Sequence, residues 1–199
     1  MKKNIENLGQ VFTQEKNIVE MLNLIKNKNG ILLEPSAGNG AILKILNKNK
    51  NKYNFKEIHA FEIDKTLTSF DYIKYGDFFK LIKNEDYENK LFDTVIGNPP
   101  YVKYKNINLE TKKELELLDF DERSNLYLFF IKKSVEKLND KGELIFLVPR
   151  DFLKATSAIK MNDWLFSQGT ITDIIDYGDE ILFAGFNPNC IVFRFERGN

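Results

Sequence analysis

Four consecutive residues, Asn98-Pro99-Pro100-Tyr101, have the side chains to promote chemistry on an amino group. They follow an apolar run over residues 91–97 that reads as a buried strand, and ligands of open α/β sheets bind beyond the carboxyl ends of strands. Proline lacks an N–H donor and keeps the preceding residue out of the helical region. The Asn98 side-chain oxygen and the Pro99 carbonyl can therefore both accept from one amino group. Such acceptors would free the lone pair of an amine on a planar ring for attack, while the Tyr101 ring lies flat on that ring. A proline-rich turn is the alternative for this motif taken alone.

A glycine loop, residues 34–40 (EPSAGNG), is the second motif. It follows a short apolar strand at 31–33 and opens a helix. Gly38 and Gly40 let the backbone pass close to a ligand. The loop lacks both the G-x-G-x-x-G pattern of dinucleotide enzymes and the Gly-Lys-Ser/Thr of a P-loop.

Together the two motifs resemble the S-adenosylmethionine-dependent DNA adenine-N6 methyltransferases, in the group where the cofactor motif precedes the catalytic one. Residues 9–13 (GQVFT) resemble that group's amino-terminal cofactor motif, and the similarity runs from Gly9 to Phe195. The resemblance implies transfer of a methyl group to the N6 amino group of an adenine in DNA, as part of a restriction–modification system. Under this resemblance the expected catalytic residues are Asn98, Pro99, Pro100 and Tyr101.

Acidic or amide residues end each of the first four expected strands: Glu34, Glu62, Asp77 and Asn98. These ends line one crevice in a doubly wound sheet, although any one acid alone reads as a solvated loop carboxylate. Glu62 can accept from both ribose hydroxyls of S-adenosylmethionine, and Asp77 from its adenine amino group. The resemblance assigns the same roles, with Phe78 stacked on adenine, Glu34 beside the ammonium and Thr13 at the carboxylate. The expected cofactor-binding residues are Thr13, Glu34, Pro35, Gly38, Gly40, Glu62, Ile63, Asp77, Phe78 and Asn98.

The target adenine must leave the DNA stack to reach this site. Tyr101 is expected to cover one face of the base. The resemblance places an aromatic residue at about Phe183 on the base as well, so Phe183 is the favoured further catalytic residue. Phe186 is a competing candidate, and core packing is the alternative for both.

Alternating strands and helices predict an α/β fold with a doubly wound, mainly parallel, seven-stranded sheet and an antiparallel final strand. This pattern resembles the Rossmann-like methyltransferase fold. Strands are expected at 31–33, 57–61, 70–75, 91–96, 143–148, 170–177 and 189–195, and helices at 14–28, 39–47, 109–118, 124–138 and 151–166.

The composition fits one catalytic domain over residues 1–199. The chain has no apolar stretch long enough to span a membrane and no signal-peptide pattern. The single cysteine, Cys190, suits a reducing compartment, so the cytoplasm is expected. His59 reads as structural, and no spacing of metal ligands appears.

DNA is the expected partner, yet 29 basic and 29 acidic residues give no net charge, and phosphate binding depends on Lys and Arg. A basic stripe that could bind phosphate is formed by Lys103, Lys105, Lys112 and Lys113. A solvated loop and helix face is an equally weighted alternative for these residues. Related enzymes continue into a target-recognition domain, which is expected to be absent here. Recognition would then lie on a separate chain, or the sequence is truncated.

Two rival functions remain at this level. N-P-P-Y also occurs in methyltransferases that act on a protein glutamine, and related motifs occur in RNA methyltransferases. A split or inactive fragment that needs a partner chain is the other alternative. Fold analogy alone does not separate them, whereas residues 9–13 and the segment 124–127 (SNLY) favour the DNA enzyme.

Overall fold

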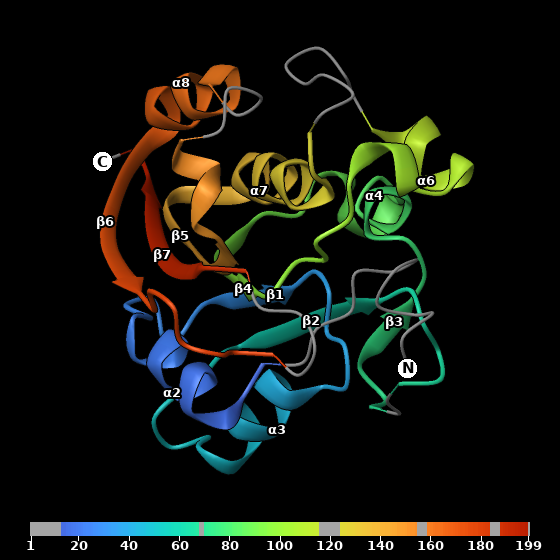
Figure 1. Ribbon diagram of the computed structural model, residues 1–199. Helices are drawn as coiled ribbons and strands as arrows, with labels where there is room; N and C mark the ends of the chain where they lie inside the picture. Colours follow the sequence, from blue (N-terminus) through green and yellow to red (C-terminus); the bar gives the residue numbers. More distant parts are fainter. Residues whose placement is uncertain (1–12, 68–69, 116–123, 155–158, 184–187, 199) are drawn as a thin grey trace.

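The computed structural model describes residues 13–67, 70–115, 124–154, 159–183 and 188–198. Within these residues seven strands form one sheet in the order β3-β2-β1-β4-β5-β7-β6 (Figure 1). All neighbours pair in parallel except β7, which runs antiparallel to both β5 and β6. The predicted fold class is therefore confirmed, and the final strand lies between β5 and β6. The strands are β1 Ile31–Glu34, β2 Glu57–Glu62, β3 Ile73–Tyr75, β4 Phe92–Gly97, β5 Leu138–Pro149, β6 Gly169–Asp176 and β7 Cys190–Arg197.

Helices cover both faces of the sheet (Figure 1). Helices α2 (Glu15–Asn23) and α3 (Ala41–Lys48) lie on one face, and α4 (Phe78–Leu81), α7 (Leu126–Glu136) and α8 (Ile159–Gln168) lie on the other. Successive strand side chains point to opposite faces. Leu144 and Phe146 accordingly join the core beneath α7, whereas Ile145 and Leu147 join the core beneath α2 and α3. This double burial explains why the central strands are apolar throughout.

Several element boundaries differ from the sequence prediction. Helix α7 begins at Leu126 because the Asn125 side chain accepts from the Tyr127 N–H and caps it. Strand β5 begins five residues early, at Leu138 instead of Glu143, because a bulge carries the chain through Lys141 at a φ of 59°.

The helix predicted at 151–166 is wrong in its first part. A short 3₁₀ turn, η2 (Arg150–Leu153), precedes α8, and residues 155–158 lie outside the described part. The third strand begins at Ile73, three residues later than predicted. Three short elements were not predicted: α4, α5 (Glu85–Glu88) and the 3₁₀ turn η1 (Tyr104–Asn106). Helix α6 (Leu109–Glu114) begins where the sequence indicated, and the predicted end at 118 lies outside the described residues.

A buried ion pair joins β5 to the neighbouring strand β7, at the end of the sheet opposite the catalytic motif. The Arg194 Nε lies 2.7 Å from Glu143 Oε2, and both side chains are almost fully buried. Glu143 also accepts from the backbone N–H groups of Lys26 and Asn27, which precede β1. The pair therefore ties β5 and β7 to the turn that leads into β1.

None of the helices in the described ranges combines the length and the apolar character needed to cross a bilayer.

Candidate active site

The structure brings the four strand-end residues together at one edge of the sheet. Glu34 ends β1 and Glu62 ends β2, while Asn98 follows β4 directly and Asp77 lies two residues after the end of β3. These four strands are consecutive neighbours, so their carboxyl ends open into a common space. The expectation from the sequence that these groups converge is correct, and the structure divides them between two adjoining cavities.

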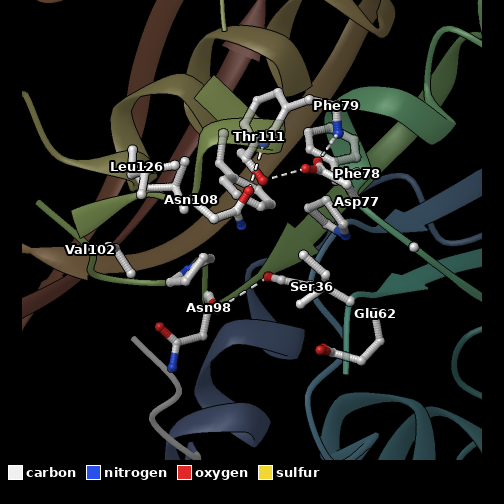
Figure 2. A pocket seen from close by; sticks show the side chains of 16 residues that line it. Ser36, Glu62, Asp77, Phe78, Phe79, Asn98, Val102, Asn108, Thr111 and Leu126 are labelled. Carbon is white, nitrogen blue, oxygen red and sulfur yellow. Dashed lines mark hydrogen bonds between the residues drawn. The ribbon is translucent and has the colours of Figure 1, made fainter. Parts of the chain in front are cut away.

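The larger cavity holds about 760 Å³ of space, counting the open region at its mouth. Figure 2 shows Asp77 on one side of it, with Asn98 and Glu62 on the other. Its walls combine a few polar side chains with aromatic and aliphatic groups, as is typical of a small-molecule site. Its predicted lining residues are Pro35, Glu62, Ile63, Asp77, Phe78, Asn98 and Pro100.

Glu62 holds the glycine loop in place. Its two carboxylate oxygens accept from the N–H of Gly38 at 2.7 Å and from the N–H of Asp64 at 2.9 Å. Gly38 and Gly40 have φ angles of 55° and 71°, which only glycine adopts at little cost. Burial raises the Glu62 pKa above its usual range although these N–H groups oppose the shift. One carboxylate thus both shapes the loop and faces the cavity.

Asp77 is held by two donors. One oxygen accepts from the Phe79 N–H at 2.9 Å, which caps α4. The other accepts a short hydrogen bond from the hydroxyl of Thr111 in α6 (Figure 2). Phe78, next to Asp77, is buried and stacks on Phe130 with ring centroids 5.0 Å apart. Its ring therefore forms a rigid part of the wall.

The smaller cavity lies beside the first and holds about 300 Å³ by the same measure. Thr13 and Glu34 line it, and Ser36 and Asn98 line both cavities. The Asn98 Nδ2 donates to Thr13 Oγ1 at 3.1 Å, and the Ser36 hydroxyl donates to the Asn98 carbonyl at 3.2 Å. Asn98 therefore stands at the junction of the two cavities.

Glu34 is the most deeply buried acid of the site. The residue is 2% exposed, and one of its carboxylate oxygens is buried with no hydrogen-bond partner among the described residues. Burial, together with the nearby charge of Glu62, raises the Glu34 pKa well above its usual range. A buried carboxyl with one oxygen left unsatisfied suits a site that receives a cationic group.

Tyr101 and Phe183 also come together, outside the two cavities. Their ring centroids lie 6.1 Å apart in an edge-to-face arrangement. The Tyr101 hydroxyl donates to the Leu147 carbonyl at 3.0 Å, which fixes the ring against β5. Phe183 is buried, so core packing already accounts for its present position. Phe186, the competing candidate, lies outside the described residues.

Half of the larger cavity's wall was not predicted. These additional lining residues are Ser36, Gly76, Phe79, Val102, Ile107, Asn108, Thr111, Leu126 and Phe130. Four of these nine, Val102, Ile107, Asn108 and Thr111, come from the segment after the catalytic motif, which the sequence showed only as a polar connection with one helix. Asn108 carried a usable signal, because asparagine before a helical stretch is a preferred cap, and its side chain accepts from the Thr111 N–H at 2.8 Å.

The basic stripe is partly neutralised. Lys113 pairs with Glu110 at 3.2 Å, and the Lys112 ammonium lies 4.9 Å from the centroid of the Tyr104 ring. Among the described residues no group of three His, Cys, Asp or Glu side chains is arranged to hold a metal ion.

The strand order, the antiparallel β7 and the acids after β1, β2 and β3 define the class I S-adenosylmethionine-dependent methyltransferase fold. The chain belongs to the family described as the Eco57I restriction-modification methylase, whose profile matches residues 2–183. The predicted resemblance to methyltransferases of restriction–modification systems is thereby confirmed, and S-adenosylmethionine is the cofactor expected for this class.

Two curated relatives are similar over most of the chain. The type II methyltransferase M.HincII of Haemophilus influenzae is 31% identical over 197 residues, which cover 96% of this chain and 38% of that protein. The type II methyltransferase M.AccI of Acinetobacter calcoaceticus is 31% identical over 159 residues, covering 72% of this chain and 28% of that protein. The chain thus spans less than two fifths of the length of these relatives.

Solved structures confirm the fold. A chain of the DrdV–DNA complex superimposes with a TM-score of 0.75 at 15% identity, covering 98% of this chain and 27% of that one. A putative class I S-adenosylmethionine-dependent methyltransferase from Listeria monocytogenes gives a TM-score of 0.66 at 20% identity, covering 92% and 58%.

Proposed function

We propose that this chain is the catalytic domain of a DNA methyltransferase that methylates the N6 amino group of adenine with S-adenosylmethionine. The observation that carries the proposal is the meeting of the two cavities at Asn98. One cavity has the apolar walls and the acids suited to an adenosine. The other has the buried Glu34 suited to an amino-acid head. Asn98 lies where these two parts of the ligand would join.

Different residues of the larger cavity would bind different parts of the adenosine. Asp77 would accept from the adenine amino group, and the buried Phe78 would contact the ring. Glu62 would accept from the ribose hydroxyls with the lone pairs that its bonds to Gly38 and Asp64 leave open. Ile63 and Pro35 would cover the ribose, since both line this cavity.

In the smaller cavity Glu34 would pair with the ammonium, and Thr13 would bind the carboxylate. Bound S-adenosylmethionine would supply an electrophilic methyl group at the junction of the two cavities.

Asn98 would hold the target amine. Its side-chain amide is oriented by the bond to Thr13, and its backbone by Ser36. The Asn98 oxygen and the Pro99 carbonyl would accept the two amine hydrogens. As the nitrogen attacks the methyl carbon and the carbon–sulfur bond breaks, positive charge develops on the nitrogen, so these acceptors bind most strongly in the transition state. Pro100 shapes the bend that presents them.

The target base would rest on Tyr101. Because the hydroxyl of Tyr101 is anchored to Leu147, the ring is held ready for a stacked base. Phe183 would contact the base by its edge, as it now contacts Tyr101.

Sequence recognition is proposed to need protein beyond the 199 residues, either a separate chain or a further domain. The relatives are more than twice as long, the net charge is zero, and Lys113 is already ion-paired. The duplex would therefore be held weakly by the catalytic domain alone. With DNA as substrate and a single free thiol, the cytoplasm is the proposed location.

The test is transfer of a tritiated methyl group to an unmethylated duplex library, followed by nucleoside analysis. The chain would be assayed alone and with the product of the adjacent gene. N6-methyladenine formed by wild type and not by Asn98→Ala is the expected result. Label on cytosine, on RNA or on a protein glutamine would contradict the assignment. Robust, site-specific methylation by the chain alone would contradict the need for further protein.

A further inference from the structure

The contact between Asp77 and Thr111 joins the cofactor side of the cavity to the segment that follows the catalytic motif. The two residues are 34 positions apart. Helix α6 packs on α4 here, and two exposed ion pairs, Lys80–Glu110 and Lys83–Glu114, flank the contact. The hydroxyl of Thr111 is therefore one of several links between the helices, but it alone among these links reaches a side chain of the cavity.

Thr111 is itself firmly placed. Its residue is 5% exposed, and its N–H donates to the Asn108 side chain at 2.8 Å in the first turn of α6. Both Asn108 and Thr111 line the cavity (Figure 2). A hydroxyl has a single hydrogen to donate, and that of Thr111 is donated to Asp77.

The two donors on Asp77 leave it little rotational freedom. The Phe79 N–H binds one oxygen and the Thr111 hydroxyl binds the other. Each carboxylate oxygen can accept more than one hydrogen bond, so acceptor capacity remains for a ligand. If Thr111 were removed, the carboxylate could rotate about its bond to the Phe79 N–H.

We propose that Thr111 is a positioning residue that aims the Asp77 carboxylate at the amino group of the cofactor's adenine. Thr111 thereby sets the preference of the cavity for adenine over purines without that amino group. This inference rests on the proposed function, because it presumes an adenosine in the larger cavity.

The test compares two ligands by titration calorimetry on the 199-residue chain. One is S-adenosylhomocysteine, the demethylated product. The other is its purine analogue, in which hydrogen replaces the amino group at C6. Because a carboxylate hydrogen bond matters only to the first ligand, Thr111→Val is expected to bind S-adenosylhomocysteine about tenfold more weakly and the analogue within about twofold of wild type. Thr111→Ser is expected to restore the preference.

Two matched variants complete the design. Lys83→Gln breaks the ion pair between Lys83, just after α4, and Glu114 of α6 without touching Asp77, and is expected to leave both affinities unchanged. Asp77→Asn is expected to lose the preference for the amino group, as Thr111→Val does. Thermal unfolding of each variant shows that it is folded.

Four results would overturn the inference. Equal weakening of both ligands by Thr111→Val would mean that the hydroxyl merely supports the wall. Tighter binding of S-adenosylhomocysteine would mean that the hydroxyl competes with adenine for Asp77. No binding of either ligand to the folded wild-type chain would overturn the proposed function along with it. Loss of preference in Asp77→Asn but not in Thr111→Val would overturn the role of Thr111 alone.

Discussion

Burial of Glu34 predicts that cofactor affinity depends on pH. The Glu34 pKa is raised well above its ordinary value because the carboxyl is buried and lies near the charge of Glu62. The free protein therefore holds a proton on Glu34 up to a higher pH than an ordinary Glu carboxyl does. An ammonium placed beside this group favours its charged form, so binding must release that proton.

The direction and the size of this pH dependence follow from the linkage between proton binding and cofactor binding. Between the ordinary Glu pKa and the raised pKa of the free site, each unit of pH should tighten binding by up to tenfold, which is about 1.4 kcal/mol. Glu34→Gln removes the titrating group, so its affinity should be nearly independent of pH and, toward neutral pH, weaker than that of wild type. Glu180→Gln, an exposed change at an ion pair with Lys16, is the matched control and should retain the wild-type slope.

The assay is titration calorimetry with S-adenosylmethionine from about pH 5 to about pH 7, below the pKa of the ligand's own ammonium. Repeating it in buffers of different ionisation enthalpy measures the protons released. An unchanged slope in Glu34→Gln would refute the pairing of Glu34 with the ammonium.

Three further predictions concern other parts of the domain. Asn98→Ala should leave the dissociation constant of S-adenosylmethionine within about threefold while methyl transfer falls by at least about a hundredfold, because the acceptor acts mainly in the transition state; equal losses of binding and rate would contradict this. Glu62→Ala should weaken cofactor binding by about tenfold to a hundredfold through lost hydrogen bonds to a charged acceptor, and calorimetry that shows unchanged affinity would remove Glu62 from the site. Glu143→Ala should lower the free energy of unfolding by about 3 kcal/mol or more, since it leaves the Arg194 charge buried without this partner. Denaturant unfolding measures the loss. A loss below about 1 kcal/mol would show that Glu196, which also contacts Arg194, suffices as its partner.

The placement of the strand-end residues was predictable from the sequence because sheet geometry determines it. Once the first four strands are recognised, their carboxyl ends must meet at one edge. Glu34, Glu62, Asp77 and Asn98 then converge whatever the details of packing. The same argument explains why errors in strand length, such as the late start of β3, did not misplace any of these residues.

The opposite wall was not predictable because it depends on contacts between distant segments. Thr111 reaches Asp77 only because α6 packs on α4. That docking rests on side-chain pairs such as Lys80–Glu110 and on the burial of Val102 and Ile107. No local pattern of residues encodes these partners.

The boundary of β5 had a different cause. Residues 139–142 (NDKG) read as a turn, and the chain does bend there, but the ladder with β4 resumes across the bulge. Leu138 pairs with Phe92 before the bulge, and Glu143 pairs with Thr94 after it. Polar bulge residues inside a strand carry the composition of a loop, so composition alone placed the strand's start too late.

The buried acids of the site reduce the stability of the free domain. A carboxyl whose pKa is higher in the folded state than in the unfolded state binds protons more tightly when folded, so stability falls as pH rises from about 4.5 toward the folded pKa. Glu34 and Glu62 both act in this direction. This loss of stability arises at the carboxyl edge of the sheet, where a ligand's ammonium and hydroxyl groups would relieve it.

At the other end of β5, Glu143 is fully supplied with donors from Arg194, Thr94 and two backbone N–H groups. The sequence therefore places two buried acids of opposite kind on one sheet: Glu143 is satisfied within the fold, and one oxygen of Glu34 has no hydrogen-bond partner among the described residues.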